Sequence, residues 1–278
     1  MSKSTVERIL LKTLKTVTNS NHVTEIVCKF FCGVLIVDGK YIHVAGHEKK
    51  IPMIWALDYV SHDPILHQLV LSENYLAYLS FFLKLKAIHY PLSTIVCDEH
   101  EAISQAAKHV YPNVKIQLCT NHIKEGIRRT LNSRSNPVHE HFIKQIECLF
   151  RKDDLGQYCR YARNLLKQHY SNDQYRYILQ EVNRKHELII RFLIDKQVPS
   201  SSNLIELYNS HLEARLKSIK GFKSFYTAEL WLNAYVLNRR LSKFTSCAKK
   251  FRHLNGSCSL SQTAMDDAKE ISLIKTAR

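Results

Sequence analysis

The chain has 278 residues, with 40 lysines and arginines against 25 aspartates and glutamates, which gives a formal net charge of +15 at pH 7. This length can bury a full core, as one large domain or as a domain with a substantial insertion. The positive charge predicts a polyanionic partner, nucleic acid first, and its spread along the chain disfavours a membrane-binding helix. The sequence has no apolar run long enough to span a bilayer and no signal-peptide pattern, so we expect an intracellular protein whose eight cysteines are reduced thiols.

The first half of the chain predicts a mixed sheet. Residues 1–31 have apolar residues at helical spacing and form either the end of a DNA-binding module or a helix packed on the main domain. Residues 32–122 then alternate strand and helix patterns. The expected strands are 32–46, 51–59, 65–71, 92–98 and 114–119, and the expected helices are 74–88 and 101–110. This order indicates an antiparallel meander followed by strands joined through crossover helices.

The second half is expected to be helical. Residues 123–199 show helical periodicity and no convincing strand, which predicts an all-α insertion. Residues 200–246 return to the core, with a long amphipathic helix at 204–220 and a final helix at 227–244. Residues 247–278 form a polar tail. The predicted fold class is therefore α/β, a mixed sheet with an all-α insertion before the helix that carries Glu206.

Three acidic residues stand at the ends of predicted elements. Asp38 is expected to end the first strand, Asp98 ends the fourth, and Glu206 lies in the first turn of the helix at 204–220. If the two strands are neighbours, both aspartates emerge at one edge of the sheet, where Glu206 could complete a triad. Such hard oxygen ligands suit Mg²⁺ or Mn²⁺, and two ions could activate a water or a 3′-hydroxyl and stabilise the leaving oxygen in phosphoryl transfer.

Each acid also has a purely structural interpretation. The Asp38-Gly39 pair is a strong hairpin-turn signal. Asp98 suits the cap of the helix that follows it, and Asn203 followed by Glu206 resembles a capping box. From these residues taken one at a time, the catalytic and structural interpretations both stay open.

A C-x-x-H sequence, formed by Cys119 and His122, follows the strand at 114–119. A structural zinc site would need two further ligands, for which Cys28 and Cys32 are a distant pair. In a second interpretation His122 lies near an active site and contacts the DNA backbone, with Cys119 packed at the strand end. In a third, the two are a buried thiol and a histidine at a helix start.

The joint pattern resembles the DDE transposases of the Mutator-like superfamily, including their bacterial insertion-sequence branch. The similar segments are VLIVDGKYIHV, TIVCDEHEAISQAAKHVYPNVKIQLCTNHI, SSNLIELYNSHLEARLKSIKGFKS and LNG near the end, so the resemblance covers residues 33–256. It implies an RNase H-like fold with a helical insertion before the last acid. It also implies that Asp38, Asp98 and Glu206 are catalytic and bind two Mg²⁺ or Mn²⁺ ions, with Cys119 and His122 near the active site.

The implied activity is metal-dependent cleavage at transposon ends to expose 3′-hydroxyls, followed by strand transfer into target DNA. The implied partners are terminal inverted repeats and target DNA, bound by a homo-oligomer that works with the genome, in a nucleoid or a nucleus. Two alternatives stay open: a domesticated, non-catalytic DNA-binding protein, and a stand-alone RNase H-like nuclease. Relatives usually carry an N-terminal DNA-binding region, so recognition is expected to use a minimal N-terminal segment plus the insertion, unless the chain is a shortened member.

DNA contacts are expected from lysines and arginines that reach phosphates, which fixes position without reading sequence. Three basic groups are candidates: Arg128, Arg129 and Arg134 after the C-x-x-H sequence; Arg215, Lys217, Lys220 and Lys223 along and beyond the helix at 204–220; and Arg239, Arg240, Lys249, Lys250 and Arg252 towards the C-terminus.

Overall fold

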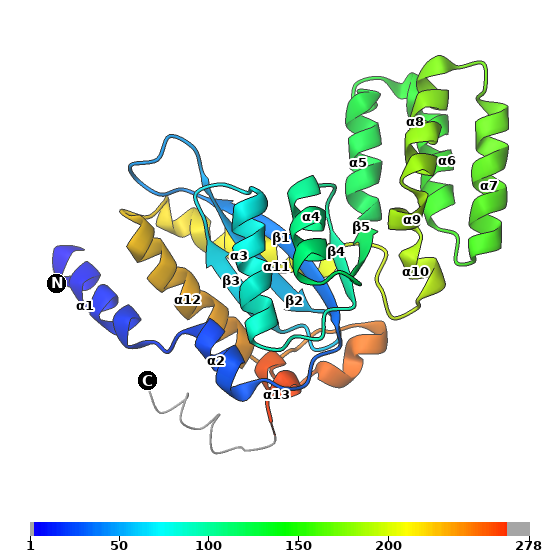
Figure 1. Ribbon diagram of the computed structural model, residues 1–278. Helices are drawn as coiled ribbons and strands as arrows, with labels where there is room; N and C mark the ends of the chain where they lie inside the picture. The colour runs from blue at the N-terminus through cyan, green and yellow to red at the C-terminus, as the bar shows by residue number, and fades with distance from the viewer. Residues whose placement is uncertain (1–2, 266–278) are drawn as a thin grey trace.

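The computed structural model describes residues 3–265, and a five-stranded sheet forms its centre (Figure 1). The strands are β1 (Val34–Ile42), β2 (Ile51–Asp58), β3 (Pro64–Leu69), β4 (Thr94–Cys97) and β5 (Lys115–Leu118), in the order β3-β2-β1-β4-β5. β2 is antiparallel to both β1 and β3, whereas β4 is parallel to β1 and β5. The sheet is therefore mixed, with the meander and crossover strands that the sequence predicts.

β1 runs unbroken through Asp38 and Gly39, which corrects two expectations. Asp38 does not end the strand, and the Asp-Gly pair is not a hairpin turn, because Asp38 pairs with Trp55 of β2 and the turn lies at residues 43–50. Tertiary packing explains the glycine. A Cβ at position 39 would lie 1.8 Å from Oε1 of Glu73, so Gly39 allows that carboxylate to approach the strand.

Helices cover both faces of the sheet (Figure 1). Side chains alternate between the faces along each strand, so neighbouring residues belong to different cores. On one face, α3 (Tyr75–Ala87) and α4 (Glu101–Val110) bury Leu35, Val37, Ile95 and Cys97. On the other, α11 (Asn203–Ile219) and α12 (Phe225–Leu241) bury Ile36, Trp55 and Val96.

The described chain between β5 and α11 is helical and contains no strand. Its elements are α5 (Thr120–Thr130), η1 (Pro137–His139), α6 (Glu140–Phe150), α7 (Leu155–Gln168), α8 (Asp173–Arg184), α9 (His186–Ile189) and α10 (Arg191–Ile194). Asp154 and Asn172 cap α7 and α8, since each accepts a hydrogen bond from a backbone N–H three residues on. These helices share a separate hydrophobic cluster around Phe142 and Leu149, and Figure 1 shows them beside the sheet.

The two ends of the described chain meet. The N-terminal helices are α1 (Lys3–Thr16) and α2 (Ser20–Val27), and the C-terminal elements are η2 (Lys249–Leu254) and α13 (Ser259–Thr263). Val27 of α2, Leu237 of α12 and Leu260 of α13 are buried in one cluster. Of the predicted tail, residues 266–278 lie outside the described part. No helix within residues 3–265 combines the length and apolar character needed to cross a membrane.

Arg240 is completely buried, which corrects its assignment to a basic surface group. Its guanidinium binds Asp63 through two parallel hydrogen bonds, with Nε 2.9 Å from Oδ1 and Nη2 2.7 Å from Oδ2. Nη1 donates to the carbonyl of Ser20 at 2.8 Å, while Thr263 donates its hydroxyl to Asp63 at 2.7 Å. This ion pair therefore joins α12, the β2–β3 connection, α2 and α13.

The substitution Arg240→Met should leave Asp63 buried without its cation. We expect a loss of about 3–5 kcal/mol in the free energy of unfolding, because breaking one partner of a buried pair strands the other charge. Urea unfolding measures this. Arg252→Met, at an exposed position on η2, is the matched control and should change stability by less than about 0.5 kcal/mol. Equal effects of the two substitutions would contradict the structural role of Arg240.

Candidate active site

Asp38 and Asp98 lie at the same level of two neighbouring parallel strands. Ile36 of β1 pairs with Val96 of β4, and each aspartate follows two residues later. Because alternate residues share a face, both carboxylates extend from the face of Ile36 and Val96, which α11 covers. Their proximity has an electrostatic signature, since the charge of Asp98 raises the pKa of Asp38.

Helix α11 brings an amide onto this pair of acids. Asn209 Nδ2 donates to Asp38 Oδ2 at 2.7 Å, and the indole Nε1 of Trp55 donates to Asn209 Oδ1 at 3.1 Å. Because an indole N–H can only donate, it fixes the orientation of the amide and directs the NH₂ group at Asp38. The backbone N–H of Gly39 donates to the other oxygen, Asp38 Oδ1, at 2.9 Å. Asp38 is thus held in one orientation from both sides.

Glu206 lies beside the C-x-x-H sequence. One ligand-type atom each from Glu206, Cys119 and His122 falls within 4.8 Å of the others. The hydroxyl of Ser202, just before α11, lies 2.9 Å from Glu206 Oε1 and 3.1 Å from Cys119 Sγ. Cys119 immediately precedes α5, so His122 is in the first turn of that helix. Ser202 therefore connects the starts of α5 and α11.

The helix-capping alternatives are not observed. The N-cap of α4 is His100, and Asp98 Oδ1 is buried with no hydrogen-bond partner among the described residues. The N-cap of α11 is Ser202 rather than Asn203, and its side chain accepts no capping hydrogen bond. Asp98 and Glu206 are therefore available for another role.

The negative charge of the two aspartates is only partly compensated. Burial raises the pKa of Asp38 to about 6, against the hydrogen bond from Gly39 and with the added effect of Asp98. Burial also raises the pKa of Asp98, and the charge of His122 opposes this shift. Like-charged buried carboxylates of this kind gain most from a nearby cation.

Cys119 and His122 favour each other's charged forms. The hydrogen bond to Cys119 raises the pKa of His122 to about 9, and the charges of Glu206 and Asp38 add to the shift. Burial opposes ionisation of Cys119, but hydrogen bonds from His122 and Ser202 lower its pKa. The arrangement favours a thiolate beside an imidazolium, with the positive ring facing the acids.

A fourth carboxylate, Glu73, reaches the same region and had not been predicted. It accepts hydrogen bonds from the hydroxyls of Tyr41 and Tyr78, the latter at 2.9 Å, and its charge raises the pKa of both Asp38 and Asp98. The sequence indicates Glu73 only indirectly, through Gly39, because a glycine inside a strand often marks a close approach by another group. Asn209 was also missed, although its position three residues after Glu206 places both on one side of α11.

The donor set fits a hard divalent cation. Asp38 and Asp98 offer carboxylate oxygens, which Mg²⁺ and Mn²⁺ prefer, and the buried Asp98 Oδ1 lacks a partner. Among the described residues, Glu206 is grouped within 4.8 Å with Cys119 and His122 and not with the two aspartates. Cys119, His122 and Glu206 offer the mixed donors of a zinc site, but Cys119 Sγ already accepts hydrogen bonds from Ser202. Cys28 lies elsewhere, where its Sγ accepts from Arg240 at 3.1 Å.

The candidate DNA-contacting residues differ in their availability. Arg128 pairs with Glu147 at 2.5 Å and Arg134 with Glu125 at 2.6 Å, both within the helical segment. The remaining candidates lie on or near the surface: Arg129 on α5; Arg215, Lys217, Lys220 and Lys223 along and beyond α11; Arg239 on α12; and Lys249, Lys250 and Arg252 on η2. Of the predicted set, Arg240 alone is fully buried.

Buried acids at one end of a mixed sheet, in a chain of net charge +15, are typical of enzymes that act on nucleic-acid phosphates through divalent cations. Residues 1–239 match the family model described as "Transposase, Mutator family", and the chain belongs to this family. The match includes α1 and α2 and ends before LNG, whereas the motifs had indicated residues 33–256. A search among curated proteins found no match.

The pKa of Asp38 gives a stability prediction. Its folded-state pKa is about 6 against an ordinary value of 3.8, so Asp38 contributes stability below pH 3.8 that is lost as the pH rises through 6. Asp38→Asn removes this loss. We expect the metal-free variant to be more stable than the wild type by about 1–3 kcal/mol at pH 8 and nearly equal to it at low pH. Urea unfolding at the two pH values, with exposed Asp153→Asn as control, tests this; a less stable variant at pH 8 would contradict it.

Asn209→Ala should weaken metal binding. The substitution frees Asp38 Oδ2 to rotate and leaves the indole N–H of Trp55 without its acceptor, so the carboxylate is no longer held in place. We expect the Kd for Mn²⁺ to rise by about 10-fold or more, measured by calorimetry on DNA-free protein. Ser210→Ala, at the next and exposed position of α11, should leave the Kd unchanged. Equal Mn²⁺ affinities of the Asn209→Ala and Ser210→Ala proteins would show that Asn209 does not support metal binding.

Proposed function

We propose that this protein is a DDE-type transposase whose catalytic core is RNase H-like and whose triad is Asp38, Asp98 and Glu206. One observation carries the proposal: parallel pairing of β1 and β4 sets the two aspartates at one level of the sheet, beneath the helix that carries Glu206. The proposed division of the chain is the predicted one: 1–31, 32–122, 123–199, 200–246 and 247–278, with the two core parts on either side of the helical insertion.

The residues divide the work by chemistry. The three carboxylates would hold two Mg²⁺ or Mn²⁺ ions, which when bound activate a water or 3′-hydroxyl and stabilise the leaving oxygen. Asn209 orients Asp38. His122, whose pKa is raised to about 9, carries positive charge at neutral pH and is placed to contact a DNA phosphate next to the acids. Cys119 lies beside that ring, with ligand-type atoms of the two residues within 4.8 Å of each other.

The proposed partners are the terminal inverted repeats of a transposon and its target DNA. The net charge of +15 supports phosphate binding, with Arg129, Arg215, Lys217, Lys220 and Lys223 as surface candidates. Joining two ends to one target requires both ends to be held together, so the active species is proposed to be a homo-oligomer on DNA. It would work where the genome lies.

Two alternatives differ in what they require of the acids. A non-catalytic, domesticated DNA-binding protein has no use for carboxylates whose burial raises their pKa and so costs stability at neutral pH. A stand-alone nuclease would use the same acids, and only its products would separate it from a transposase.

Asp98→Asn should abolish cleavage and leave DNA affinity within about twofold of the wild type, because phosphate contacts supply most of the affinity and Asp98 supplies none. Nicking of supercoiled plasmid in Mn²⁺, and joining of 3′-hydroxyl oligonucleotides to that plasmid, measure the activity. Filter binding at fixed salt measures affinity. Asp153→Asn, an exposed acid of the helical segment, should behave as the wild type.

Each result selects one function. An Asp98→Asn protein that still cleaves would overturn the mechanism. A wild-type protein that binds DNA but never cleaves it would favour the domesticated protein. Cleavage by the wild type without joined products would favour the nuclease.

A further inference from the structure

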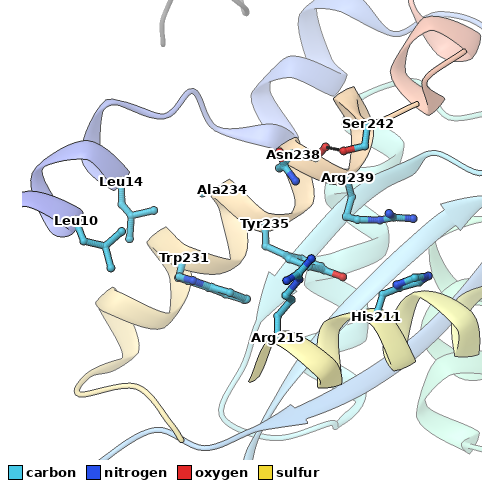
Figure 2. Close-up of a pocket in the computed structure, with 10 residues that line it drawn as sticks. All are labelled: Leu10, Leu14, His211, Arg215, Trp231, Ala234, Tyr235, Asn238, Arg239 and Ser242. Carbon is cyan, nitrogen blue, oxygen red and sulfur yellow. Dashed lines mark hydrogen bonds between the residues drawn. The ribbon is translucent and has the colours of Figure 1, made fainter. Parts of the chain in front are cut away.

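A pocket of about 420 Å³ lies between α1, α11 and α12, and its lining includes none of the candidate triad residues (Figure 2). We call it the α12 pocket. Its main lining residues are Leu14, His211, Arg215, Trp231, Tyr235 and Arg239. Figure 2 shows the side chains of Trp231 and Tyr235 from α12 beside those of Arg215 and His211 from α11. A volume of this order is typical of small-ligand sites, about 300–1,000 Å³.

One wall of the α12 pocket is aromatic. Trp231 and Tyr235, one helical turn apart on α12, stack with ring centroids 5.4 Å apart and an interplanar angle of 10°. Buried Phe222 supports Trp231 from the side at a centroid distance of 5.6 Å. Both stacked rings are only partly buried. A rigid aromatic surface of this kind is what nucleobases stack on in proteins that bind single strands.

The same pocket holds cations without counter-charges. Within the described residues, neither Arg215 nor Arg239 forms an ion pair, and buried Tyr235 Oη and Arg239 Nε have no hydrogen-bond partner. Burial raises the pKa of Tyr235 to about 12, while the charges of Arg239 and Arg215 act to lower it, so both guanidiniums lie near this hydroxyl. Buried donors left unpaired are costly, and an anionic ligand would satisfy them.

These features select the kind of occupant. An apolar peptide would cover the rings but would leave Arg215 without a counter-charge and the buried Tyr235 Oη and Arg239 Nε without hydrogen-bond partners. A nucleotide supplies a flat base for the rings and a phosphate for the guanidiniums. Arg215 follows Glu206 by nine residues on the same helix, which is about 13 Å along its axis, or roughly four 3.4 Å steps of a DNA strand.

We propose that the α12 pocket binds a nucleotide of single-stranded DNA, with the base against Trp231 and Tyr235 and its phosphate held by Arg215 and Arg239. The proposal rests on the proposed function in one respect, that DNA is the partner. It adds a second holding point for a DNA strand, outside the triad, where a base that has left the duplex is retained.

Tryptophan fluorescence tests the proposal directly, because the chain has two tryptophans and Trp55 is fully buried beneath α11. The experiment titrates the full chain carrying Asp98→Asn, in EDTA, with a thymidine 12-mer. The fluorescence of Trp231 should be quenched, and Trp231→Phe should remove most of the change. Arg215→Ala should raise the Kd for the 12-mer by about 10-fold, because it removes a charge-assisted contact as well as a charge. Lys108→Ala removes the same charge from an exposed position of α4, outside the proposed DNA-contacting residues, and should raise the Kd by no more than about threefold.

An abasic 12-mer separates stacking from phosphate binding. It should bind at least about 10-fold more weakly than the thymidine 12-mer, since base stacking on an aromatic ring contributes a substantial share of the affinity. No quenching, equal affinity for the abasic strand, or equal effects of Arg215→Ala and Lys108→Ala would overturn the proposal. Arg215 is exposed, so its substitution does not threaten folding, and urea unfolding of the variant verifies this.

The two proposals fail separately. A wild-type protein that cleaves and joins DNA, but shows no quenching by the 12-mer, would refute the α12 pocket and leave the transposase function intact. Base-dependent quenching that is lost in Arg215→Ala, in a protein with no cleavage activity, would keep the pocket and refute the catalytic function.

Discussion

The parallel pairing of β1 with β4 forces two carboxylates together at one level of the sheet, and much of the surrounding structure compensates for their repulsion. Asn209 donates to Asp38, His122 faces the acids with a raised pKa, and Ser202 donates to Glu206. Asp98 Oδ1 stays buried without a partner. The compensation is incomplete, as the raised pKa values of both aspartates indicate. Buried carboxylates with raised pKa values destabilise the folded protein at neutral pH, and such groups are concentrated at functional sites. Their presence here therefore supports a functional role.

A buried ion pair outside the acid cluster stabilises the fold. Arg240 and Asp63 form a buried pair whose remaining hydrogen-bonding atoms contact α2 and α13, so the charges are both neutralised and solvated by the protein. This network fixes α12, and α12 together with α11 covers the sheet face from which the acids emerge. The Arg240–Asp63 pair and the acid cluster therefore both contact the layer formed by α11 and α12. The ion pair stabilises the fold, whereas the buried acids destabilise it at neutral pH.

The elements of the fold could be predicted from hydrophobic periodicity, because it reflects which side of each strand or helix is buried. Asp98 and Glu206 were correctly placed at a strand end and in a helix first turn for that reason. The position of Asp38 was not, since the local Asp-Gly turn signal competes with pairing to β2 and with the close approach of Glu73. The burial of Arg240 depends on Asp63, 177 residues earlier, and no local pattern indicates that pairing. Asn209 and Glu73 could not be predicted from the sequence, because their roles depend on tertiary contacts with residues far away in the chain.

Helix α11 links these regions because its faces serve different purposes. Ile205, Tyr208 and Leu212 are buried against the sheet, while near the start of the helix Asn209 contacts Asp38 and Glu206 lies beside Cys119 and His122. Further along, Arg215 turns to the α12 pocket. Tyr208 forms the contact between the two regions, since its ring packs on Trp55, the partner of Asn209, and lies 5.0 Å from the guanidinium of Arg239. The acids and the pocket therefore share one support, since α11 contributes Asn209 to the first and Arg215 to the second.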